Sequence, residues 1–438
     1  MTSNAIVALS IFIITFIFIL AEKAIHVHRT IVALLGACVM VIVGTMLNFY
    51  TIKSAFLMID MDTITLLLGM MILVAILEKT GAFQFLAIKS AKLSKGNPIR
   101  LLFYLSLITS ILSMFLDNVT TIVLIAPVTL IITSMMKISS IPFLITEAIL
   151  SNISGTSTLV GDPPNIMIAS AVPKMSFMSF ITHSLPHIVI VWIVVFLTIL
   201  FIFRKELAEK PSGFEVMLKT KPEDYLTDKP NAVKLCILFC VVVIFFFISE
   251  QIHLTTSVIA IFGAGVGFLI TKADIEETLK KVEFPILLFF AALFALVGGL
   301  EHSGFLKEIS ISVLSLAKTN MLLCCIVVIW VSAAISAVID NIPFTIAMIP
   351  ILQALGLQLG DPNLITPLWW ALVFGVGLGG NGTHIGATAN IVVVSLSEKT
   401  DTPITTLTWL RTGLVTTIIS LITVSLTFVV MYSHMTTK

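Results

Sequence analysis

Long apolar segments limit this sequence to a membrane fold more strictly than any single motif does. A hydrocarbon core about 30 Å thick requires about 20 apolar residues in each helix that crosses it. With 58% of its residues apolar and only 11% charged, the chain has more apolar surface than a soluble domain could bury. It is therefore predicted to be an all-α polytopic membrane protein. The uninterrupted candidate spans lie at 5–21, 31–50, 62–78, 185–203, 235–249, 256–270, 284–300 and 411–432.

The charge balance and the cysteines exclude other classes. The 25 basic and 24 acidic residues leave a net charge of +1 and form no basic face, so nucleic-acid binding is excluded as a main activity. The five cysteines have neither metal-ligand spacing nor a disulfide pattern. We expect no cofactor and no bound metal.

The two halves of the chain repeat each other. A shift of 223 residues aligns polar residues and glycines in the same order, which chance apolar similarity would not produce. Further along the chain the shift is 227 for Gly155-Thr156 on Gly382-Thr383 and 225 for Asn165 on Asn390. The positions matched at 223 are Glu78 with Glu301, Ser113 with Ser336, Asp117-Asn118 with Asp340-Asn341, and Pro127 with Pro350.

Interrupted apolar segments within each repeat predict the domain plan. The repeats span 1–203 and 235–438, joined by a polar linker at 204–234 that contains three prolines. Inverted repeats with broken helices at mid-membrane are how many secondary transporters build their binding site. Re-entrant hairpins are predicted at about 101–137 and 321–360, and broken helices at about 140–172 and 364–396.

The distribution of basic residues predicts the orientation. If the hairpins enter and leave from one side, 20 of the 25 basic residues share a side, and by the positive-inside rule that side is the cytoplasm. The linker is then cytoplasmic, both termini are outside and the repeats are inverted, with about ten to eleven crossings of a cell inner membrane. The basic residues on the other side are Lys53, Lys174, Lys307, Lys318 and Lys438.

Asp117-Asn118 and Asp340-Asn341 are the strongest candidates for function. An Asp in an apolar span is costly, so it is functional by default, although Asp and Asn are also good helix N-caps. Their recurrence at matched places in both repeats favours function, and the two interpretations are compatible because a hairpin tip also exposes helix ends.

The second pair of interruptions is rich in glycines, hydroxyls and amides. Asp162-Pro163-Pro164 is interpreted first as the N-cap and first turn of an outgoing half-helix. His384 is balanced between a structural role and a role in proton or substrate binding, and Glu147 is considered only as a proton-relay residue. The candidate substrate- or ion-binding residues are Asp117, Asn118, Thr120, Thr121, Gly155, Thr156, Ser157, Asn165, Asp340, Asn341, Thr345, Asn381, Gly382, Thr383, His384 and Asn390.

The pattern Asp117-Asn118-Val119-Thr120-Thr121, followed by the segment from Gly155 to Asn165, resembles the ion transporter superfamily over nearly the whole chain. The similar branch holds the melanosomal P protein and arsenite permeases. The resemblance implies a homodimer whose protomers have a static scaffold and a transport part that moves as an elevator. The related sodium–dicarboxylate carriers have Ser-Asn-Thr at both hairpin tips, whereas two aspartates stand here. Two extra carboxylates repel a dianion and favour a cation or a proton.

The leading hypothesis is an ion-coupled secondary transporter of a small inorganic ion or metalloid, and not an enzyme. Proton-coupled efflux of arsenite or antimonite comes first, with Asp117, Asp340 and His384 in proton coupling and H⁺ or Na⁺ as the coupling ion. Sodium–proton antiport comes second, and an anion or dicarboxylate carrier third. A membrane subunit of an ATP-driven arsenite pump would need a separate cytosolic ATPase as partner, because the chain lacks a P-loop. A channel is disfavoured because no repeated carbonyl-filter motif is present.

Overall fold

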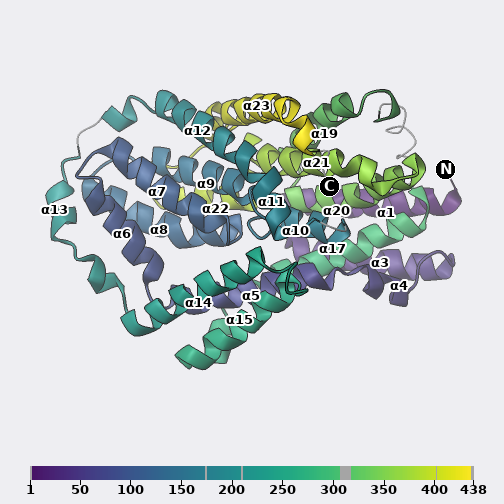
Figure 1. Cartoon of the computed structure of the whole chain (residues 1–438), viewed down its shortest axis with the longest axis horizontal. Helices are drawn as coiled ribbons and strands as arrows, with labels where there is room; N and C mark the ends of the chain where they lie inside the picture. The colour runs from purple at the N-terminus through teal and green to yellow at the C-terminus, as the bar shows by residue number, and fades with distance from the viewer. Residues whose placement is uncertain (1, 173–174, 209–210, 306–316, 401, 436–438) are drawn as a thin grey trace.

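Helices account for every regular element in the part of the chain that the structure describes (Figure 1). The structure, a computed structural model, describes residues 2–172, 175–208, 211–305, 317–400 and 402–435. Lys174, Lys307 and Lys438, which the orientation argument uses, lie outside these ranges. Nine of the described helices are long and apolar enough to cross a bilayer. The prediction of an all-α polytopic membrane protein is confirmed.

One set of helices, here called the scaffold, contains helices from both repeats, and helices of one repeat pack against helices of the other. Helix α5 of the first repeat packs along α15 of the second, and α17 of the second packs along α3 of the first. Small residues allow these close contacts: a Cβ on Gly69 would lie 2.7 Å from the backbone of Ala260. The scaffold consists of α1 (Ser3–Leu20), α2 (Glu22–Ile25), α3 (Arg29–Met46), α4 (Ile52–Met58), α5 (Met61–Glu78), α14 (Lys229–Phe247), α15 (Thr256–Thr271), α16 (Ile275–Leu279) and α17 (Phe284–His302).

The interrupted segments form the second part, here called the hairpin bundle. Its two helix pairs, α7 with α8 and α19 with α20, lie toward opposite ends of the molecule (Figure 1). Each pair reverses direction within four residues, at 114–117 and at 337–340. The bundle consists of α7 (Pro98–Ser113), α8 (Asn118–Met136), α9 (Ile141–Gly155), α10 (Pro163–Ala171), α19 (Met321–Ser336), α20 (Asn341–Leu359), α21 (Thr366–Gly379), η4 (Gly380–Gly382) and α22 (Thr388–Ser397).

The first broken helix is held in shape by one asparagine. Helix α9 ends at Gly155 and α10 begins at Pro163. The Asn165 amide donates to the carbonyls of Gly155 (3.0 Å) and Thr158 (2.7 Å), which pairs carbonyls that the break leaves outside the helical ladder. Gly155 and Gly161 touch so closely that a Cβ on either would lie 2.6 Å from the other's carbonyl oxygen. Side chains at these two positions would force the break open.

The second broken helix repeats this arrangement. Asn390 donates to the carbonyls of Gly380 (2.9 Å) and Thr383 (3.0 Å). Gly155 is therefore equivalent to Gly380, at a shift of 225. The predicted match of Gly155 with Gly382 at 227 is wrong, because the sequence alignment followed the Gly-Thr pair and not the carbonyl that the asparagine binds.

The remaining helices flank the bundle or belong to the linker region. Helix α12 packs against α23, one from each repeat. Helix α14 begins at Lys229, inside the segment predicted as linker. These elements are α6 (Ala82–Leu93), α11 (Phe177–His183), α12 (Leu185–Ile202), η1 (Glu206–Ala208), α13 (Phe214–Lys219), η2 (Pro222–Tyr225), η3 (Pro362–Ile365), α23 (Thr406–Val430) and α24 (Tyr432–Met435).

Candidate functional site

The tips of the two helix pairs and the first broken helix meet at a buried cavity, here called the central cavity. Its volume is about 20 Å³, which is room for one water-sized species. Apolar side chains from α5 and α17 of the scaffold cover its other wall. The polar residues that line it are Arg29, Asp117, Asn118, Asp162, Asp340, Asn341 and Thr388.

Asp117 both caps a helix and faces the cavity. It is the N-cap of α8, and its carboxylate accepts a hydrogen bond from the Thr120 backbone N–H at 2.9 Å and another from the Thr120 hydroxyl. The capping interpretation is confirmed, and it leaves the carboxylate on the cavity lining. Both of its partners belong to its own helix, so no positive charge is fixed beside Asp117 by these contacts.

Asp340, the equivalent residue of the second repeat, is held differently. One carboxylate oxygen lies 3.5 Å from the Ile342 backbone N–H, a weak cap. The other accepts from the Arg29 guanidinium at 2.8 Å and from the Thr388 hydroxyl at 3.0 Å. The guanidinium also lies over the Phe289 ring, 5.2 Å from its centroid. Arg29 begins α3 of the scaffold, so this ion pair joins the scaffold to the hairpin bundle.

Asp162 has a role that its position in the sequence did not predict. It occupies the N-cap position of α10, but its side chain makes no capping hydrogen bond. The next two residues are prolines, and Pro164 has no N–H to offer at the position where an N-cap carboxylate normally accepts one. The buried carboxylate instead accepts from the Asn341 amide at 3.2 and 3.4 Å. The predicted N-cap position and first turn of the half-helix are confirmed, but the Asp162 side chain does not cap the helix and instead lines the cavity.

A chain of asparagine side chains connects the two repeats behind the cavity. The Asn118 amide donates to Asn152 at 2.7 Å. Asn152 in turn donates to Asn381 at 2.8 Å and to Asn390 at 3.0 Å. All four are buried, where a satisfied polar network is rigid and an unsatisfied one is costly. Asn152 was not among the predicted site residues, and its place at the end of α9 beside the Gly-rich break was the available signal.

The charge of the lining is unbalanced. Three carboxylates face the cavity against one guanidinium, a formal charge of −2 if all are ionised. Carboxylates that share a low-dielectric site cannot all remain charged without a proton or a cation. Arg29 compensates Asp340, which leaves Asp117 and Asp162 as the groups that most need one. Arg29 is one of the 20 basic residues that predict the cytoplasmic side, and a lone Arg at the start of an apolar span is itself unusual.

Some of the predicted site residues line a cavity, and the others lie behind the lining. Asp117, Asn118, Asp340 and Asn341 line the central cavity, and Thr120 lines a smaller cavity beside it. His384 is half-buried in the second break and is not part of either lining. Glu147 is buried in α9, where it accepts from the Thr129 hydroxyl at 2.6 Å. The predicted residues that lie behind the lining are Thr121, Gly155, Thr156, Ser157, Asn165, Thr345, Asn381, Gly382, Thr383 and Asn390.

Comparison with known proteins agrees with this architecture. The fold is similar to the crystal structure of the YdaH transporter of Alcanivorax borkumensis, with a TM-score of 0.62, 12% sequence identity and 99% of both chains covered. Among relatives, the 46 kDa membrane protein of Mycobacterium leprae is 36% identical over 95% of this chain and 96% of its own length. An uncharacterized transporter of Mycobacterium tuberculosis is 36% identical with the same coverage.

The resemblance to the melanosomal branch is also confirmed. The P protein of Mus musculus is 33% identical over 85% of this chain, and the match covers 54% of the mouse protein. The family described as "Citrate transporter" matches residues 16–375. That match spans the scaffold helices α3, α5, α14, α15 and α17, both helix pairs and the first broken helix. The chain is therefore a membrane transporter that belongs to the citrate transporter family.

Proposed function

We propose that the protein is a secondary transporter driven by a cation, H⁺ or Na⁺, that binds at the central cavity. One observation carries the proposal: aspartates from both repeats and from the first break converge on a space the size of one water molecule. Asp117 and Asp162 would take up the cation directly, and Asn118 and Asn341 would add amide oxygens. Oxygen atoms of this kind suit a hard cation.

The dimensions of the cavity restrict the kind of solute that can bind in it. A space of about 20 Å³ fits a cation far better than an organic anion, and the excess of carboxylates would repel citrate or a dicarboxylate. This favours sodium–proton antiport, which the sequence alone placed second. Arsenite efflux is still worth testing, since neutral arsenous acid would meet amides and hydroxyls here. None of the five cysteines lines the cavity, so thiolate chelation would play no part.

The contact between the two parts suggests how the site would reach both faces. Arg29 holds Asp340 in the arrangement described, and its ion pair would have to break if the hairpin bundle moved past the scaffold. We propose an elevator-type movement of this kind in a homodimer. Light scattering of the purified protein would test the dimer. Cysteine labelling near residues 95 and 318 would test the predicted cytoplasmic and external faces.

The deciding experiment is flux in proteoliposomes that contain this chain alone. A pH gradient or a sodium gradient is imposed without ATP, and uptake of ²²Na⁺, arsenite and citrate is compared. Gradient-driven uptake of one of them, lost in Asp117→Asn, is the expected result. Uptake only when a cytosolic ATPase and ATP are added would favour the pump. Conductance that depends on no second ion would favour a channel and overturn the proposal.

A further inference from the structure

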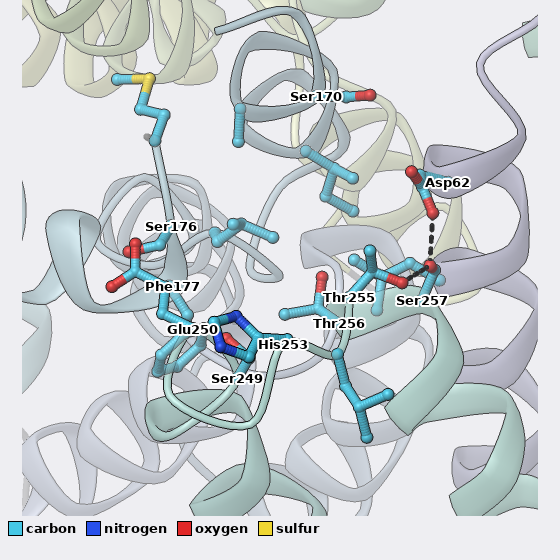
Figure 2. A pocket seen from close by; sticks show the side chains of 16 residues that line it. Asp62, Ser170, Ser176, Phe177, Ser249, Glu250, His253, Thr255, Thr256 and Ser257 are labelled. Carbon is cyan, nitrogen blue, oxygen red and sulfur yellow. Dashed lines mark hydrogen bonds between the residues drawn. The ribbon is translucent and has the colours of Figure 1, made fainter. Parts of the chain in front are cut away.

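A second and much larger cavity, here called the vestibule, opens between the scaffold and the hairpin bundle (Figure 2). Its volume is about 530 Å³. Helices α5 and α15 and the loop before α15 form one wall, while α10 and the start of α11 form the other. Its polar lining residues are Asp62, Ser170, Ser176, Ser249, Glu250, His253, Thr255, Thr256 and Ser257.

The vestibule is acidic. Asp62 and Glu250 are exposed in it, together with His253, and none of its sixteen lining residues is Lys or Arg. Figure 2 shows Asp62 on one side of the space and Glu250 and His253 on the loop across it. The Ser257 hydroxyl donates to one Asp62 oxygen at 2.5 Å, which fixes that carboxylate at the wall. A concave surface with this charge raises the local concentration of cations and repels anions.

Two apolar side chains separate the vestibule from the site. Leu66 and Ile166 line the vestibule, and they also line a small cavity of about 10 Å³ that contains Asp117 and Thr120. Both are almost completely buried, with 1% and 4% of their surface exposed. The small cavity in turn shares Leu67, Met71 and Asp117 with the central cavity. The three spaces therefore follow one another from the surface to the carboxylates.

The route is one-sided. Thr256 begins α15 at the vestibule, and Arg29 begins the corresponding helix of the first repeat, α3. Where Thr256 faces an open acidic space, Arg29 instead makes an ion pair with Asp340 and donates to Thr388. The fold thus presents a water-accessible approach at one of the two related places and a fixed cation at the other.

We propose that the vestibule collects the coupling cation and that Leu66 and Ile166 form the gate through which it reaches Asp117. The proposal rests on the function given above for the central carboxylates. It adds a recruiting surface, a gate and a direction of approach. Leu66 and Ile166 are the two residues that the linings of the vestibule and the small cavity share, which is why the gate is placed at their side chains.

Reactivity of a cysteine behind the gate tests this route without knowledge of the cargo. Val160 lines the small cavity and is buried, so Val160→Cys is made in the full chain with its five native cysteines replaced by alanine. The purified protein in detergent is treated with a small cationic methanethiosulfonate and with neutral methyl methanethiosulfonate. In Asp62→Asn/Glu250→Gln the cationic reagent should react about 5-fold more slowly at low salt, and the neutral reagent at an unchanged rate.

The gate is tested in the same protein. Ile166→Trp should slow both reagents at least about 10-fold, and Leu66→Ala should accelerate both, since access to the small cavity sets the rate. Ser170→Cys, which lies in the vestibule before the gate, should react normally in Ile166→Trp and so reports that the variant is folded. Val195→Cys, buried in α12, should remain unreactive throughout.

A matched pair of acidic residues outside the vestibule is the charge control. Glu223→Gln/Glu276→Gln removes two exposed carboxylates and should change neither rate. Equal effects of this pair and of the vestibule pair would overturn the recruiting role. If the reaction rate at Val160→Cys is the same in Leu66→Ala and Ile166→Trp as without these changes, the proposed gate is wrong. If Asp117→Asn kept its gradient-driven flux while these labelling results held, the proposed function would fail and the route would stand.

Discussion

The two hairpin tips have the same sequence pattern and different environments. Asp117 and Asp340 both stand at the N-cap of the second helix of their pair, 223 residues apart. Within the described ranges of the chain, the donors to the Asp117 carboxylate both belong to Thr120, whereas Asp340 also binds Arg29 of the scaffold. The duplication supplied two equivalent tips, and one arginine in a different part of the fold made them unequal.

This difference assigns different tasks to the two aspartates. The Arg29–Asp340 pair is partly accessible, with 18% and 15% of the side chains exposed, so it contributes less than a fully buried pair would. It nevertheless places a positive charge beside Asp340, and none of the contacts among the described residues places one beside Asp117 or Asp162. We infer that Asp340 acts mainly as a point of attachment to the scaffold in this arrangement. In the proposed function, Asp117 and Asp162 would then be left to bind the cation.

The largest effect is expected from Asp117→Asn. The change removes a charge from the cavity but keeps the α8 cap, because Asn caps helices about as well as Asp. Gradient-driven flux should fall on the order of 100-fold, equivalent to losing about 2.7 kcal/mol of cation binding, while the melting temperature stays near that of the wild type. Asp228→Asn, at the N-cap of α14 away from the cavity, is the matched control and should keep its flux. Normal flux in Asp117→Asn would remove this residue from the site.

Removing the arginine should make the two tips alike. In Arg29→Gln the Asp340 carboxylate loses its fixed partner, so the apparent affinity for Na⁺ or H⁺ should rise by about 10-fold, or about 1.4 kcal/mol. The double variant Arg29→Gln/Asp340→Asn should return close to the wild-type affinity, since it removes both members of the pair. The measurement is the dependence of flux on Na⁺ concentration and on pH. An affinity that is unchanged or lower in Arg29→Gln would contradict the view that the arginine neutralises Asp340 at the second tip.

The sequence was sufficient for the parts of the fold that depend on periodic or repeated features. Apolar length predicts the spans, and the recurring Asp-Asn pairs predict the two tips that meet at the cavity. The Asp162 side chain does not cap α10 for a local reason that the sequence already contains. Two prolines remove N–H groups from the first turn of α10, so a carboxylate before them has little reason to fold back onto it.

Contacts between segments far apart in the chain could not be predicted from one sequence. Arg29 and Asp340 are 311 positions apart, and Asn152 and Asn390 are 238 apart. Nothing in either local pattern specifies the partner. The sequence placed Asn165 on Asn390 at a shift of 225 but did not extend that shift to Gly155 and Gly380, because their equivalence depends on which carbonyl each asparagine binds. Pairing of side chains across a fold is a property of packing, and sequence spacing alone does not contain it.

A smaller effect is expected where the two repeats are joined behind the tips. Asn152→Ala leaves the Asn381 and Asn390 side-chain oxygens without the donor that they share. Each buried oxygen left unpaired is costly, so the free energy of unfolding should fall by about 2–3 kcal/mol. Thermal unfolding in detergent measures this, and Asn320→Ala, which removes the cap of α19 at an exposed position, is the reference for loss of one local hydrogen bond. A loss no greater than that of Asn320→Ala would show that the asparagine chain contributes little to the assembly of the site.

The smallest effects should still distinguish the two tips. Thr120→Val and Thr388→Val each remove one hydroxyl that donates to a tip carboxylate while keeping the shape of the side chain. At the first tip this hydroxyl is one of two donors to Asp117, so cation affinity should change by about 3–5-fold, within the 1 kcal/mol that one such hydrogen bond contributes. At the second tip Arg29 still holds Asp340, so Thr388→Val should change affinity by less than about 2-fold. Equal responses would mean that Arg29 does not make the tips unequal, and the functional difference would then have to come from Asp162 alone.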